Sequence, residues 1–135
     1  MIQRKQTLFI IISLVLTSII IFFIDIIDSS KCNLNLSVSN EPVLNMFFCI
    51  SLILGIVSFF FFKRRVVQYK MCLFNMYFQI CPLFFSFNWL SFKSCYPLYD
   101  EILGILFIYA IFLFYGLASL YIKKDDDLVK SSNRI

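Results

Sequence analysis

The residues with the most organised chemistry form a row that begins just before one long apolar segment, residues 71–92, and continues through it. They follow one another at steps of three or four residues: Gln68, Cys72, Asn75, Gln79, Pro82 and Ser86. In an α-helix this spacing places them on one face. Polar groups that face lipid are costly, so we expect the row to face neighbouring helices and to hydrogen-bond with them. The alternative is a polar seam for a small solute or for a polar helix of a partner.

Other reactive residue types lack the companions that catalysis or metal binding requires. The chain contains no histidine, which removes the commonest metal ligand. Its five cysteines match no zinc or haem spacing. The three adjacent aspartates at 125–127 have no further ligands at useful spacing, and we interpret them as a solvated end of a helix. No nucleophile has an activating base beside it in the sequence. We therefore predict a protein without a cofactor, a metal site or enzymatic activity.

The composition places these residues in a membrane. Of 135 residues, 61% are hydrophobic and 15% are charged, and the mean hydropathy is +0.87. Four apolar runs without Asp, Glu, Lys or Arg are long enough to cross a bilayer as helices, at about 8–24, 43–62, 71–92 and 102–122. Short connections make successive helices antiparallel. The sequence thus predicts an all-α, integral membrane protein whose four transmembrane helices form an up-down-up-down bundle, as a single domain 1–135 without a soluble domain.

The distribution of Lys and Arg predicts the orientation. Two lie at the N-terminus, four in the loop 63–70 and four in the C-terminal tail, and the remaining two are Lys31 and Lys93. Basic loops stay in the cytoplasm, so we expect both termini there. The net charge of +4 is then explained by topology, and no nucleic-acid partner is predicted. The expected partners are the lipid bilayer and a membrane protein, either a different one or a second copy.

Two cysteines lie in the loops that this orientation puts outside. Cys32 belongs to the first loop and Cys95 to the third. In an oxidising exterior they could form a disulfide. The alternative is two free thiols.

Three segments carry a resemblance to a known family. They are the opening Met1 to Thr7, the stretch Arg65-Val66-Val67-Gln68 with Cys72 and Asn75, and the tail Asp127 to Arg134. Together they resemble the small four-helix membrane proteins of Bacteroidetes classed as domain of unknown function 4293. The tail departs from the family pattern at Lys130 and Asn133. The resemblance implies a bacterial inner-membrane protein with four spans and no established activity.

All three segments fall on the predicted cytoplasmic side, which suggests that they associate there. The hypothesis pairs Gln3, Arg4 and Gln6 with Arg65, Gln68 and Arg134. With Asn75 and Gln79 of the polar row, these are the candidate interaction residues. The predicted role is a structural or accessory subunit without catalysis. The alternative is a small oligomeric transporter or channel that uses the polar row of the third helix.

Overall fold

The computed structural model describes residues 3–23, 27–29, 34–36, 41–92 and 103–132. Its elements, in chain order, are α1 (Gln3–Phe23), β1 (Ile27–Ser29), β2 (Leu34–Leu36), α2 (Pro42–Phe60), a 3-10 turn η1 (Phe61–Lys63), α3 (Arg65–Phe78), α4 (Ile80–Phe92) and α5 (Leu103–Ser132). The fold is therefore all-α apart from a short antiparallel ribbon in which Ile27 lies opposite Leu36. The sequence does not predict this ribbon, because three-residue strands are too short to show an alternating pattern.

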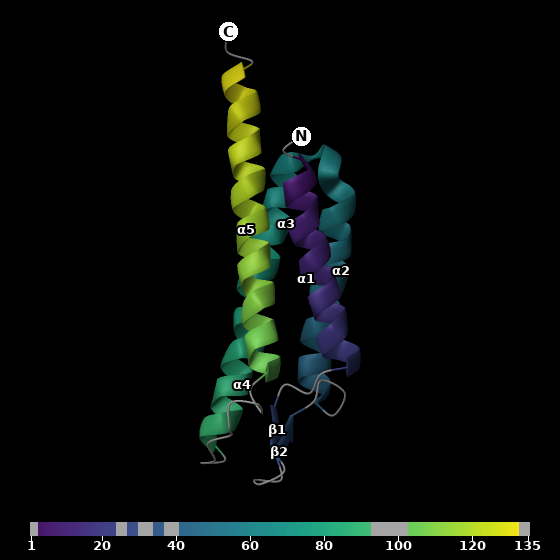
Figure 1. Cartoon of the computed structure of the whole chain (residues 1–135), viewed down its shortest axis with the longest axis vertical. Helices are drawn as coiled ribbons and strands as arrows, with labels where there is room; N and C mark the ends of the chain where they lie inside the picture. The colour runs from purple at the N-terminus through teal and green to yellow at the C-terminus, as the bar shows by residue number, and fades with distance from the viewer. Residues whose placement is uncertain (1–2, 24–26, 30–33, 37–40, 93–102, 133–135) are drawn as a thin grey trace.

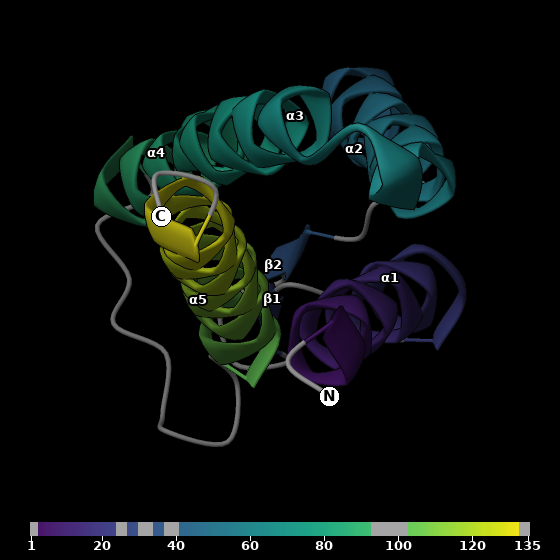
Figure 2. The same ribbon diagram turned by 90° about the horizontal axis from the view of Figure 1, so that it is seen from above.

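The helices form a four-sided bundle. Helix α1 packs against α2 and α5, and α3 packs against the same two helices from the other side. Figure 1 shows that α1, α2, the α3–α4 pair and α5 run in alternating directions, and Figure 2 shows them around a common axis. The start of α1, the η1 turn and the end of α5 share one end of the bundle, and the ribbon lies at the other (Figure 1).

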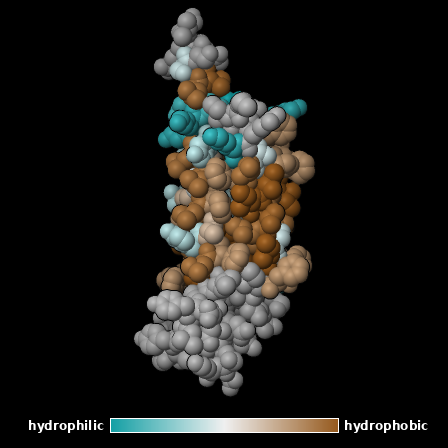
Figure 3. Space-filling view, viewed as in Figure 1, coloured by the Kyte–Doolittle hydropathy of each residue, from teal (hydrophilic) through white to brown (hydrophobic). Residues whose placement is uncertain are grey.

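The bundle buries polar side chains among the apolar residues of its core and exposes many large apolar side chains, unlike a water-soluble domain. Buried side chains include Ser13, Thr17, Ser51, Asn75 and Gln79. Large apolar side chains cover the outer surface instead, and Figure 3 shows them over the middle of one face, with hydrophilic groups toward the end that holds the N-terminus. Such an apolar exterior marks a surface that lipid covers. Within the described residues, three helical stretches are long and apolar enough to cross a membrane: Lys5–Phe23, Pro42–Lys63 and Gly104–Ser131.

The sequence predicts one helix over 71–92, and Pro82 within it predicts a kink near Phe78, because it frees the carbonyl four residues earlier. The structure breaks the segment next to this point. Helix α3 already begins at Arg65, and the chain turns at Gln79 before α4. The break follows from Pro82, which has no N–H to donate to the carbonyl of Phe78. The backbone N–H of Gln79 is shared between the backbone carbonyls of Asn75 and Met76, each at an N···O distance of 3.2 Å. At about 1.5 Å per residue, α3 and α4 are each about 20 Å long, so neither is long enough to cross a bilayer by itself.

The last helix is longer than predicted. We expected the span to end near Ile122 and the aspartates at 125–127 to form a solvated end of the helix. Helix α5 instead continues to Ser132 over 30 residues. An ion pair between Lys130 Nζ and Asp126 Oδ2, at 2.6 Å and one turn apart, supports the helical form of this extension.

Candidate functional site

The polar row on the third segment is buried, and its central residues hydrogen-bond to α2. Ser51 Oγ donates to Asn75 Oδ1 at 2.8 Å, and Asn75 Nδ2 donates to the Ser51 carbonyl at 3.0 Å. Gln79 Nε2 donates to Ser51 Oγ at 2.6 Å. One serine therefore binds two amides across the helix interface. The structure accounts for these amides as interhelical contacts, which contribute about 0.6 to 2 kcal/mol each in membrane proteins.

The same interface continues along the row toward the start of α3. Cys72 Sγ lies 3.1 Å from Ser58 Oγ, and both residues are fully buried. Ser51 and Ser58 are two helical turns apart on α2, which places both of them toward α3. Farther along the third segment, Ser86 Oγ donates to the carbonyl of Pro82 within its own helix, at 2.8 Å. At the α4 end of the row, the Ser86 hydroxyl therefore bonds to the backbone of its own helix and not to a neighbouring helix.

Two buried polar atoms near the helix break keep unused hydrogen-bonding capacity. Among the described residues, Gln79 Oε1 and the Tyr115 hydroxyl have no well-formed hydrogen bond. The Tyr115 ring belongs to α5 and is fully buried, beside the polar side chains of Ser13 and Asn75. Unpaired polar atoms inside a bundle are costly. The packing around the polar row therefore leaves these two atoms unexplained.

Tyr115 reaches the bundle axis because α2 has a glycine opposite it. A Cβ built on Gly55 would overlap the Tyr115 hydroxyl and would lie 2.7 Å from Leu14 Cδ2. Leu14 belongs to α1, so three helices meet at this glycine. Tyr115 is not among the interaction residues predicted from the sequence. A signal was present, because Ser51 and Gly55 have the four-residue spacing of small residues that allow close helix approach.

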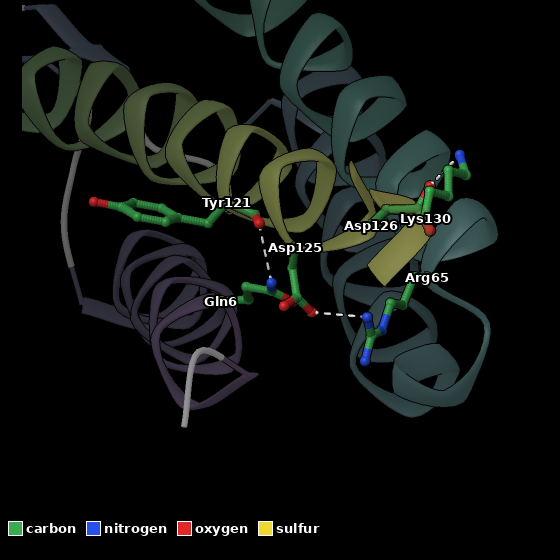
Figure 4. A network of polar contacts seen from close by, with 6 residues as sticks. All are labelled: Gln6, Arg65, Tyr121, Asp125, Asp126 and Lys130. Carbon is green, nitrogen blue, oxygen red and sulfur yellow. Dashed lines mark hydrogen bonds and ion pairs between the residues drawn. The ribbon is translucent and has the colours of Figure 1, made fainter. Parts of the chain in front are cut away.

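A second polar cluster lies at the end of the bundle that holds the N-terminus (Figure 4). Gln6 Nε2, from α1, donates to the carbonyl of Tyr121 in α5 at 3.0 Å. Arg65 Nη1, at the start of α3, lies 3.2 Å from Asp125 Oδ2 of α5, and the two side chains are 26% and 9% exposed. Helix α5 is thereby tied at this end to both α1 and α3.

Asp125 corrects the interpretation of the three aspartates as a solvated helix end. Its carboxylate is buried and ion-paired, while Asp126 pairs with Lys130. A sequence signal for this burial exists: Ile111, Tyr115, Ala118, Ile122 and Asp125 follow one another at alternating steps of four and three residues. That is the spacing of a single packing face. Helix α5 therefore continues its buried face into the charged tail.

A cavity of about 610 Å³ opens between α1, the end of α2 and the start of α3. Its walls are apolar and its far end is polar: the apolar lining comes from Leu8, Ile11, Ile12, Phe59 and Phe62, and the polar lining from Gln6, Thr7, Arg65 and Gln68. Gln6 and Gln68 are themselves buried. This amphipathic lining distinguishes the cavity from the mainly apolar outer faces of the bundle.

The structure therefore brings three of the predicted interaction residues to one place and leaves others outside its description. Gln6, Arg65 and Gln68 line the same cavity. Asn75 and Gln79 lie in the separate cluster around Ser51. Gln3 and Arg4 belong to α1, but their side chains, like Arg134, lie outside the described residues. Cys32 and Cys95 also lie outside them, so the proposed disulfide stays a prediction.

Metal chemistry has no candidate among the parts of the chain that the structure describes. No group of three or more Cys, Asp or Glu side chains is gathered there as a cation site. The described cysteines Cys49, Cys72 and Cys81 are free thiols. What the described residues offer is therefore hydrogen bonding, one partly buried ion pair and an amphipathic cavity.

Comparison with known proteins gives a family and no activity. No curated protein and no solved structure matches the chain. The match to a family covers residues 2–135, which is nearly the whole chain and includes both polar clusters and the cavity between the helices. The chain belongs to the family described as Domain of unknown function (DUF4293).

Proposed function

We propose that this protein is a multi-pass protein of the bacterial inner membrane that acts as a structural or accessory subunit and carries out no catalysis. In this proposal the broken α3–α4 segment supplies a fourth span, and both termini lie in the cytoplasm. The three basic segments at one end of the bundle support that orientation, because basic loops are retained in the cytoplasm.

One observation carries the proposal: the polar side chains of the third segment are directed at a neighbouring helix of the same chain. Asn75 and Gln79 both bond to Ser51. Residues used in this way hold helices together. The surface that remains for other molecules at this depth is apolar, and apolar helix faces suit packing against lipid or against another membrane helix.

The test is purification of the tagged full chain from its native membrane in a mild detergent, followed by native mass spectrometry. A second membrane protein at fixed stoichiometry is the expected result. Matched variants locate the contact: Phe84→Ala changes an outward side chain that is 69% exposed, and Leu106→Ala changes another that is 62% exposed. Loss of the companion in one variant, with helicity unchanged, supports the proposal. A homo-oligomer or a monomer that recovers no companion would overturn the accessory role.

The alternative is a small oligomeric transporter or channel that uses the polar row. The observation in its favour is the break at Gln79, where Oε1 is buried without a hydrogen bond among the described residues. Broken helices with free polar groups form solute sites in some transporters. Purified protein in vesicles should then show solute flux that Gln79→Leu abolishes and that Asn88→Leu, on an exposed face, preserves. Equal flux with and without the protein removes this alternative.

A further inference from the structure

We propose that the cavity between α1, α2 and α3 binds one anionic phospholipid, with an acyl chain along its apolar walls and the phosphate at Arg65. The proposal goes beyond the accessory role. It needs membrane insertion only, and the orientation decides merely which leaflet provides the lipid.

The first argument is the lining. The apolar walls lead to a polar end formed by Gln6, Arg65 and Gln68. A phospholipid has the same arrangement, because its apolar acyl chain leads to a polar headgroup. The volume of about 610 Å³ lies within the range of about 300–1,000 Å³ that is usual for small-molecule sites. A helix of a second copy would fill the apolar part and leave the polar end without a partner.

The second argument is position. Leu8 and Phe62, on the two sides of the cavity, are 52% and 56% exposed, so it opens toward the surface that lipid covers. Its polar end includes Arg65, which directly follows Lys63 and Arg64. Figure 3 shows hydrophilic groups at the end of the bundle that holds the N-terminus, above the apolar middle. A phospholipid in the bilayer can therefore enter sideways with its headgroup already at the right depth.

The third argument is charge. Lys63 and Arg64 precede Arg65 and are exposed, and exposed Lys5 precedes Gln6. The carboxylate that pairs with Arg65 is Asp125. A guanidinium has five N–H donors, so one ion pair leaves donors for a phosphate. Basic pockets between membrane helices bind anionic headgroups in this way. The excess of positive charge favours an anionic over a zwitterionic lipid.

Asp125 gives the proposal a distinctive consequence. Its carboxylate competes with the lipid phosphate for Arg65. Replacing Asp125→Asn should therefore increase the affinity for anionic lipid, even if the variant is less stable. A purely structural ion pair predicts no such gain.

The experiment titrates the full chain in detergent with dioleoylphosphatidylglycerol or with dioleoylphosphatidylethanolamine and counts bound lipids by native mass spectrometry. We expect one tightly bound phosphatidylglycerol and weaker phosphatidylethanolamine. The double variant Arg65→Gln/Asp125→Asn, which keeps the pair neutral, should weaken phosphatidylglycerol binding about fivefold. Lys70→Gln removes a nearby charge that does not line the cavity and is the matched control.

A second pair of variants tests the cavity without changing charge. Ile11→Trp fills it, and Ile53→Trp adds the same ring to an exposed face of α2. Loss of the single bound lipid in Ile11→Trp alone supports the proposal. Equal binding in both variants would overturn it, because the lipid would then cover the surface generally. A change of oligomeric mass in Ile11→Trp without a change in bound lipid would also overturn it, in favour of a second copy. None of these outcomes depends on whether a companion protein is found.

Discussion

Gly55 offers the sharpest test of how the bundle is packed. A methyl group at this position would overlap the Tyr115 hydroxyl and crowd Leu14 Cδ2 at 2.7 Å. Overpacking of this kind costs about 1–3 kcal/mol. Alanine also favours the helix over glycine by about 0.5–1 kcal/mol. The net effect of Gly55→Ala should be a loss of about 0.5–2 kcal/mol in the free energy of unfolding.

Gly116 is the matched control within the same bundle. A Cβ added there would lie 3.2 Å from Met76 Sδ, at the movable part of a flexible side chain. Gly116→Ala should therefore leave the free energy of unfolding unchanged or raise it by up to about 1 kcal/mol. The two substitutions are chemically identical, so helix propensity cancels in the comparison and the difference reports the packing alone.

The measurement is reversible unfolding in mixed micelles of mild detergent and sodium dodecyl sulfate, followed by circular dichroism. Tyr115→Phe removes the overlapping oxygen, so the double variant Gly55→Ala/Tyr115→Phe should recover much of the loss. The cycle of the two single variants and the double variant gives their coupling energy. Equal stability of Gly55→Ala and Gly116→Ala, or no coupling to Tyr115→Phe, would refute the contact of the Tyr115 side chain with Gly55.

Three further predictions concern the polar contacts and the helix break. Asn75→Leu removes both hydrogen bonds to Ser51 and should cost about 1–3 kcal/mol in the same unfolding assay, whereas Asn88→Leu, which loses only a bond within its own helix, should cost little. Arg65→Gln leaves the buried carboxylate of Asp125 without its cation and should lower the free energy of unfolding by about 2 kcal/mol. The double variant Arg65→Gln/Asp125→Asn should recover most of this loss. Equal stability of the single and double variants contradicts the ion pair. Pro82→Ala restores a backbone N–H and should join α3 to α4 as one continuous helix. The backbone amides around residue 82 should then exchange their hydrogens more slowly. Unchanged exchange means that the break has another cause.

The sequence predicts the helices well because their signal is long. Four runs without charge already require helices, and α1 and α2 follow two of these runs closely. The start of the third helix was harder to predict. Its first turns contain Arg65 and Lys70 and therefore lie outside the charge-free run, although these turns are helical. Apolar content locates the part of a helix in lipid and not the whole helix. The same limit explains why α5 extends ten residues past Ile122, to Ser132.

The candidate site was predictable only where one helix carries the pattern. The spacing of Asn75 and Gln79 indicates a buried face, yet the partner of that face is a single serine on another helix. Nothing in the local sequence selects Ser51 among the small residues of α2. The cavity was equally hidden, since its lining combines α1 with α2, η1 and α3, which lie far from α1 in the sequence. Tertiary geometry, and not residue type, determines both features.

Asp125 shows how the two polar regions of the molecule are related. It occupies the next position on the face of α5 that already buries Tyr115 and Ile122, so the packing of the membrane-embedded helix determines where this carboxylate points. The carboxylate in turn holds the Arg65 side chain, which lines the cavity. A change of register in α5, caused by a residue inserted between Tyr115 and Ile122, would rotate Asp125 by about 100° and release Arg65. The chemistry at the basic end therefore depends on helix packing deep in the bundle, and a mutation far from the cavity can alter it.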